Sequence, residues 1–158
     1  MHISASIERI AAMFPEDKAP MGNEVLYKGA DVADPDLAEI MSFFSGRSWR
    51  SITPSEVFNF RHALSYFSPC ALAYFTPAWM TCALLDRHAV DTAIENLVGT
   101  LGEVNPAIWT QEQRLIICAW LAHFNTYNLN SVKALFERAG RNIAFNTRNI
   151  RSDINKGT

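Results

Sequence analysis

A stretch of 23 residues without a charged side chain constrains this fold more than any other feature of the chain. Residues 63–85 contain no Asp, Glu, Lys or Arg. The stretch is long enough to cross a bilayer, but Pro69 and Pro77 interrupt it, and serine, threonine and tyrosine side chains are scattered through it. A helix that is apolar all round and does not span a membrane lies in a protein core. We therefore predict a buried central helix that is kinked or broken at a proline.

Helix start signals dominate the remaining sequence, and strand-like alternation is nearly absent. A capping residue followed by proline marks a helix start, as does a capping box in which Ser or Thr precedes Glu or Gln by three positions. Such patterns occur at Asp34 with Pro35, at Thr53 with Glu56, and at Thr110 with Gln113. Apolar residues follow each of them at helical spacing. The sequence therefore predicts an all-α fold.

The length of the chain favours a single folded domain. A chain of 158 residues matches one domain and is large enough to bury a core without disulfides or metals. We predict one helical domain over residues 1–158, a bundle of about six to seven helices, with a frayed basic tail over residues 141–158. The connection 15–33 is longer than most links between helices, so we expect it to carry function or a short extra element.

The apolar faces of the predicted helices identify the expected core. Residues on these faces that we expect to be buried are Phe60, Leu64, Phe67, Leu72, Trp79, Leu84, Leu115 and Leu121. Trp49 is expected to be buried between two helices. The cysteines lie in apolar helical contexts and are interpreted as small buried hydrophobic residues, rather than as disulfide partners or nucleophiles: Cys70, Cys82 and Cys118.

The sequence contains no recognisable motif for catalysis, metal binding or a cofactor. The histidines lie far apart and at none of the spacings that metal sites use: His2, His62, His88 and His123. Glycine-rich nucleotide loops and the nucleophile motif of serine hydrolases are also missing. We therefore predict a protein that is not an enzyme and needs no metal or cofactor. The N-terminus lacks the pattern of a signal peptide, so we expect a cytoplasmic location.

Charge is distributed unevenly along the chain. Residues 1–132 carry 8 basic and 14 acidic side chains, a net charge of −6, whereas residues 133–158 carry 6 basic and 2 acidic side chains, a net charge of +4. An acidic cluster lies around the start of one predicted helix: Asp31, Asp34, Asp36 and Glu39. Two interpretations of this cluster stay open. It is either a solvated face that starts a helix, or a docking surface for a basic partner.

The middle of the chain contains a set of well-spaced motifs: Trp49, the step Phe67-Ser68-Pro69, the segment Tyr74-Phe75-Thr76-Pro77-Ala78, and a later helix with Gln113, Leu115 and Leu121. In these motifs the chain resembles an uncharacterised family, a domain of unknown function, of small all-helical bacterial proteins. The match spans about residues 37–125, and Thr76 replaces the leucine usual before the second proline. Some family members look like immunity proteins against secreted toxins. The resemblance implies a helical fold and no catalytic residue.

From these features we expect a partner-binding protein, most concretely a cytoplasmic immunity protein that binds and neutralises a cognate secreted bacterial toxin domain. The acidic cluster is its expected binding surface. No membrane association is expected, nucleic acid is not the expected partner, and the oligomeric state stays open. One alternative is a small enzyme that uses Glu56, Arg61, His62 and Tyr66. The other is a nucleic-acid or regulatory module that uses the basic tail, residues 138–156.

Overall fold

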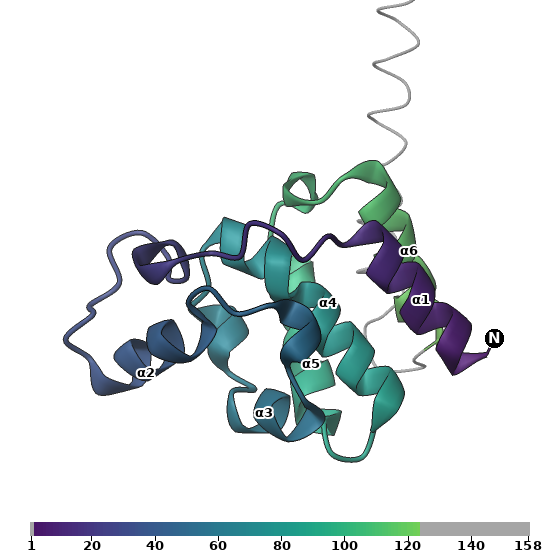
Figure 1. The fold of residues 1–158 in the computed structure, drawn as a ribbon, viewed down its shortest axis with the longest axis horizontal. Helices are drawn as coiled ribbons and strands as arrows, with labels where there is room; N and C mark the ends of the chain where they lie inside the picture. The colour runs from purple at the N-terminus through teal and green to yellow at the C-terminus, as the bar shows by residue number, and fades with distance from the viewer. Residues whose placement is uncertain (1, 124–158) are drawn as a thin grey trace, which may run out of the picture. The chain divides into compact units, whose positions relative to one another are not determined.

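The computed structural model describes residues 2–123 of the chain. Helices make up the regular structure of this part (Figure 1). The α-helices are α1 (Ile3–Met13), α2 (Pro35–Phe44), α3 (Pro54–Asn59), α4 (Pro69–Leu85), α5 (Asp91–Glu103) and α6 (Gln111–His123). The short 3-10 helices are η1 (Gly22–Glu24), η2 (Trp49–Ser51), η3 (Ala63–Ser65) and η4 (Pro106–Ile108). This architecture confirms the predicted all-α class.

Contacts between Cα atoms divide the chain into two compact units. The first unit ends at Glu103 and the second begins at Val104. The first holds α1 to α5, and the described part of the second holds η4 and α6. Compact units of this kind need not fold separately, so the single domain over residues 1–158 remains a prediction. The predicted tail over residues 141–158 lies outside the described residues.

Capping explains where the helices begin. The Asp34 carboxylate accepts a hydrogen bond from the backbone N–H of Asp36 and caps α2, with proline in the first helical position. Thr53 and Glu56 form the predicted capping box of α3. Thr110 and Gln113 form that of α6, with N···O distances of 3.0 and 3.2 Å. These bonds satisfy backbone N–H groups that a helix start leaves without partners.

Helix α4 is the centre of the first unit. Of its 17 residues, 11 are buried. Helices α1, α3 and α5 pack around it together with η2 (Figure 1). Because α4 has no charged side chain, covering all of its faces removes apolar surface from water without the cost of burying a charge. The predicted central apolar helix is therefore confirmed.

Within residues 2–123, no helix combines the length and the apolarity that crossing a membrane requires.

Pro77 lies inside α4 and does not divide it. The helix runs from Pro69 to Leu85 as one element. A proline has no N–H with which to bond the carbonyl one turn earlier, so a helix loses one hydrogen bond at this position. In the turn before, the Thr76 hydroxyl donates to the Leu72 carbonyl, with an O···O distance of 2.6 Å. Burial of both Thr76 and Pro77 keeps this part of the helix in the core.

An aromatic cluster around Phe44 joins α2 to the residues that follow α3 and to α4. The Phe44 side chain is fully buried. The aromatic rings with centroids 4.8–6.0 Å from its own are those of Phe43, Phe60, Phe67, Phe75 and Trp79. Most of these pairs meet edge to face, the arrangement that aromatic quadrupoles favour. The cluster holds the C-terminal end of α2 against the middle of α4.

Most of the predicted core residues are buried, and two are not. The confirmed ones are Leu64, Phe67, Leu72, Trp79, Leu84 and Leu121, together with Trp49. Phe60 is only half-buried, because its ring stacks on that of Phe43 near the surface. The prediction for Leu115 is wrong, since this side chain is 61% exposed.

The exposure of Leu115 follows from the burial of its neighbour, Arg114. The Arg114 guanidinium donates from Nη1 to the carbonyl of Trp109, with an N···O distance of 2.7 Å, and more weakly to that of Pro106. These bonds hold Arg114 inward at 3% exposure. Arg114 then shares the buried face of α6 with Ile117, Cys118 and Leu121. A polar residue on the inner face therefore shifts the buried stripe by one position relative to the apolar pattern.

A pair of leucines in α4 tests this orientation of the core. Leu72 is 3% exposed and Leu85 is 60% exposed. Leu72→Ala leaves a cavity, so we expect the free energy of unfolding to fall by about 3 kcal/mol. Leu85→Ala removes an exposed side chain and is expected to change it by less than about 0.5 kcal/mol. Urea unfolding followed by circular dichroism measures both values, and equal losses would contradict the described orientation of α4.

Candidate functional site

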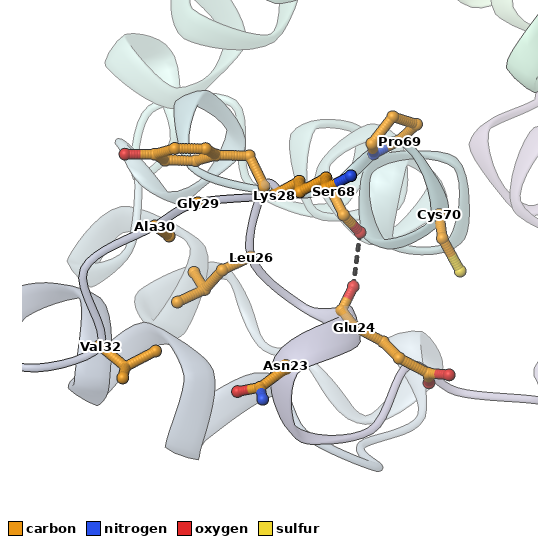
Figure 2. A pocket seen from close by; sticks show the side chains of 11 residues that line it. Asn23, Glu24, Leu26, Lys28, Gly29, Ala30, Val32, Ser68, Pro69 and Cys70 are labelled. Carbon is orange, nitrogen blue, oxygen red and sulfur yellow. Dashed lines mark hydrogen bonds between the residues drawn. The ribbon is translucent and has the colours of Figure 1, made fainter.

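A hollow of about 640 Å³ lies between the connection from α1 to α2 and the start of α4 (Figure 2). We call it the connector hollow. The residues that line it are Asn23, Glu24, Leu26, Tyr27, Lys28, Gly29, Ala30, Val32, Ser68, Pro69 and Cys70. Figure 2 shows the chain from Asn23 to Val32 passing to one side of the first turn of α4. Most of the hollow therefore comes from the long connection that the sequence singled out.

The connection is fastened where it leaves α1. The Trp49 indole N–H donates to the carbonyls of Phe14 and Pro15, with N···O distances of 3.2 and 3.3 Å. The Glu16 carboxylate accepts from the hydroxyl of Ser48 at 2.6 Å, and its carbonyl accepts from the hydroxyl of Tyr74. Trp49, predicted to be buried between two helices, thus also fixes the start of the connection.

The middle of the connection is bonded to the end of α2. The backbone N–H of Gly46 donates to the carbonyl of Pro20 at 2.8 Å, and the N–H of Gly22 donates to the hydroxyl of Ser45 at 2.7 Å. Gly46 has a φ of +66°, and a Cβ there would lie 2.7 Å from the sulfur of Met21. The backbone angle favours glycine at this position, whereas the flexible Met21 side chain could move to make room for a Cβ.

An isolated antiparallel bridge holds the next part of the connection beside the start of α4. Leu26 lies opposite Phe67. The main-chain hydrogen bonds on either side run from Tyr27 N–H to the Tyr66 carbonyl and from Ser68 N–H to the Val25 carbonyl, both with N···O distances of 2.9 Å. A short pair of this kind is weak by itself, so it depends on the packing of Leu26 and Phe67, which are both buried.

Ser68 links the connection to the first turn of α4. Its hydroxyl accepts from the backbone N–H of Ala71 at 3.0 Å and so caps the helix, while it donates to the carbonyl of Glu24 (Figure 2). On the other side, a turn is closed by the Ala30 N–H and the Tyr27 carbonyl, 3.1 Å apart. Gly29 has a φ of +89° in this turn, a conformation that glycine adopts without strain.

Two apolar side chains of the hollow face solvent. Tyr27 is 43% exposed and Val32 is 50% exposed. Among the described residues, neither the hydroxyl nor the ring of Tyr27 has a hydrogen-bond or ring partner. An aromatic side chain that offers an unused ring face and hydroxyl beside a hollow is typical of the anchors in protein interfaces. The pattern of the sequence did not identify either residue, because nothing local distinguishes them from ordinary loop residues.

The predicted acidic residues lie next to this hollow and on α2. Asp31 stands between Ala30 and Val32, which both line the hollow, and its carboxylate accepts from the N–H of Ala33 at 2.9 Å. Asp34 is the N-cap of α2, so the interpretation as a helix start is confirmed for this residue. Asp36 and Glu39 follow in the helix itself, and all four acidic residues are exposed: Asp31, Asp34, Asp36 and Glu39.

The negative charge of this region is not neutralised within the described part of the chain. Residues 16–39 contain seven carboxylates and two lysines, a net charge of −5. Among the described residues, Glu16 is the one carboxylate of this segment in a salt bridge, with Arg50 at 3.5 Å, and the other salt bridge joins Arg47 to Glu56 at 2.9 Å. The acidic cluster from Asp31 to Glu39 is therefore exposed and without a salt bridge among the described residues.

The residues of the enzyme alternative serve local contacts. Glu56 caps α3 and accepts two 2.9 Å hydrogen bonds from the Arg47 guanidinium. Arg61 donates to the carbonyl of Phe58 and lies over its ring. His62 and Tyr66 are exposed, and no hydrogen bond joins any of the side chains of this set to another: Glu56, Arg61, His62 and Tyr66. The structure does not assemble them into one catalytic arrangement.

The cysteines differ in their surroundings. Burial, reinforced by the negative charge of Glu56, raises the pKa of the Cys82 thiol to about 12, and the thiol donates to the carbonyl of Ile52. Cys118 is also buried. The prediction that Cys70 is buried is wrong, because it lies in the exposed first turn of α4 and lines the hollow. Within residues 2–123, no group of three or more His, Cys, Asp or Glu is placed to hold a metal ion.

Comparisons with protein-family models, with curated proteins and with solved structures find no match for this chain. The resemblance to a family of helical bacterial proteins therefore remains an expectation from the sequence.

Two substitutions distinguish the contribution of the Asp34 capping hydrogen bond to stability from that of its negative charge. Asp34→Ala removes the hydrogen bond to the N–H of Asp36, so we expect the free energy of unfolding to fall by about 1 kcal/mol. Asp34→Asn keeps an oxygen acceptor and removes the charge, so we expect a much smaller loss. Thermal unfolding of the two variants measures the difference. Equal destabilisation would show that the charge, and not the cap, matters for folding.

Glu56 makes stability depend on pH. Burial alone would raise the pKa of its carboxyl group, but hydrogen bonds from the Thr53 N–H and from Arg47 outweigh burial and hold that pKa below its ordinary value of 4.5. The stabilisation from ionised Glu56 is therefore complete above about pH 4.5 and is lost as the pH falls through its lower folded-state pKa. Glu56→Gln keeps the capping acceptor and removes the titrating group.

We expect Glu56→Gln to be less stable than the unaltered protein at pH 7, and the difference to shrink as the pH falls below about 4.5. Urea unfolding at a series of pH values measures this. A difference that is the same at every pH would contradict the role of the ionised carboxylate.

Proposed function

We propose that this protein is a non-catalytic partner-binding protein, most concretely a cytoplasmic immunity protein that binds and neutralises a cognate secreted bacterial toxin domain. One observation carries the proposal. A preformed hollow with the exposed apolar side chains of Tyr27 and Val32 lies next to a cluster of acidic residues whose charge is not neutralised among the described residues.

This combination matches what protein interfaces use. Aromatic anchors and the pockets beside them supply most of the binding free energy, and the surrounding polar rim excludes water. A charged rim speeds the encounter with a partner of opposite charge and disfavours partners of like charge. The net charge of −5 over residues 16–39 therefore favours a basic partner. Toxins that act on nucleic acids are commonly basic, because their substrate is a polyanion.

The surface is also held in place before any partner arrives. Contacts from Trp49, Gly46 and Ser68 fasten the connection at its start, middle and end. A surface that is already ordered loses less conformational entropy on binding, which favours tight association. In many inhibitor complexes the backbone of the interface moves little between the free and bound states, which is consistent with an ordered binding surface.

A non-catalytic role is consistent with how the carboxylates near the hollow are used. Glu24 accepts from the N–H of Met21 at 2.9 Å, Asp31 accepts from the N–H of Ala33, and Asp34 caps α2. Each of these groups fixes the backbone of the connection. The nucleic-acid alternative depends on residues 138–156, which lie outside the described residues.

Co-expression tests the proposed function. The toxin domains encoded beside the gene for this chain are expressed in a bacterium with and without it. We expect growth to be restored in its presence, and a complex of fixed stoichiometry to be recovered by size-exclusion chromatography. If none of the neighbouring products is toxic or forms a complex with the chain, the immunity function is wrong.

Charge reversal then tests the surface in that complex. Asp36→Lys with Glu39→Lys reverses two exposed charges that cap no helix. A matched control, Glu95→Lys with Glu103→Lys, makes the same change of net charge on α5, where both residues are exposed. We expect the first pair to slow association with the toxin by about tenfold at low salt and the control pair to change it much less. Equal effects, measured by stopped-flow, would place the interface elsewhere.

A further inference from the structure

Arg114 is a buried cation that uses only one of its three guanidinium nitrogens. The residue is 3% exposed, and its Nη1 donates to the carbonyls of Trp109 and Pro106, with N···O distances of 2.7 and 3.4 Å. Nε and Nη2 are buried and have no hydrogen-bond partner among the described residues. A guanidinium carries five N–H donors, so the donor on Nε and both donors on Nη2 are left without an acceptor.

The positive charge of Arg114 is not neutralised either within the part of the chain that the structure describes. Neither of the salt bridges there involves this residue. Over residues 104–123 the sequence holds one carboxylate, that of Glu112. Glu112 is exposed and lies two positions before Arg114 in α6, a spacing at which helical side chains do not face each other.

A buried guanidinium without a counter-ion is strongly destabilising, because it has lost the hydration of its charge. Water molecules at Nε and Nη2 would accept the hydrogen bonds but would leave the charge in place. A carboxylate does both. The two nitrogens that lack partners, Nε and Nη2, also form the edge of the guanidinium whose parallel N–H bonds a carboxylate accepts side-on, one with each oxygen.

We propose that the Nε–Nη2 edge of Arg114 is a binding site for one carboxylate group. The bonds from Nη1 to the carbonyls of Trp109 and Pro106 orient this edge, because the guanidinium is planar and one of its nitrogens is fixed. This inference goes beyond the proposed function and does not depend on it. The carboxylate has two possible sources. One is an acidic residue of the chain after α6, Glu137 or Asp153, both outside the described residues, and the other is a second molecule.

A double-mutant cycle in the full chain tests the first source. Arg114→Met removes the guanidinium and leaves a paired carboxylate without its counter-ion, so we expect Tm to fall by about 10 °C. Glu137→Gln or Asp153→Asn, whichever removes the source, should lower Tm similarly. Combined with Arg114→Met, that substitution should lower Tm little further, whereas the other substitution should simply add its own effect.

NMR of the Arg114 Nε–Hε signal tests both sources in the folded protein. Arg114→Lys, which keeps the charge and a donor for the Trp109 carbonyl, identifies the signal by its loss. Substitution of the source residue, Glu137 or Asp153, should shift the signal. If the source is a second molecule, sodium acetate should shift it with a saturating dependence on concentration, at least about threefold more than sodium chloride at equal ionic strength.

Arg61 provides the matched control in the same spectra. Its Nη1 also donates to a backbone carbonyl, that of Phe58, but the residue is not buried. Its Nε–Hε signal should respond equally to acetate and to chloride, and should be unchanged by Glu137→Gln and Asp153→Asn.

The outcomes separate the two sources and the failure of the proposal. Non-additive loss with one acidic residue, or a shift of the Arg114 signal when that residue is replaced, assigns the carboxylate to the chain. A saturating response to acetate, with additive cycles, assigns it to a second molecule. Additive cycles, an Arg114 signal unmoved by either substitution, and equal responses to acetate and chloride would together overturn the proposal, whatever the stability of Arg114→Met.

Discussion

The burial of α4 on all sides is the constraint on which the first unit depends. An uncharged helix with apolar residues around its whole circumference is stable in water only when other segments cover every face. Helices α1, α3 and α5 provide most of this cover, and the aromatic cluster around Phe44 adds α2 at one end. The remaining cover comes from η2, whose Trp49 brings the start of the long connection into contact with the core.

The candidate site is a consequence of that cover. Leu26 and Phe67 are buried side by side. The chain that leads from Leu26 to α2 therefore passes over the surface at the start of α4. Its turns leave Tyr27 and Val32 exposed, at 43% and 50%. The same packing that stabilises the fold therefore leaves a hollow beside α4, and the Ser68 hydroxyl links the connection to the first turn of that helix.

The charged side chains of the acidic cluster, Asp31 to Glu39, differ in their pairing from those around Arg47 and Arg50. Arg47 and Arg50 each form an ion pair with a nearby carboxylate and lie over a nearby aromatic ring. The carboxylates from Asp31 to Glu39 have no such partners among the described residues, so their field extends into solvent. A binding protein benefits from this division, since its stability is secured by one set of charges and its partner is attracted by another.

The sequence by itself determined the local features: the caps at Asp34, Thr53 and Thr110, the all-α class and the buried helix around Trp79. Caps and apolar runs depend on residues close together in the chain, so one sequence is enough to find them. Only the tertiary structure decided the inward turn of Arg114, which exposes Leu115, and the hydrogen bond between Ser68 and Glu24, 44 positions apart, which builds the hollow. Such contacts depend on which segments meet in space, and no local pattern records that choice.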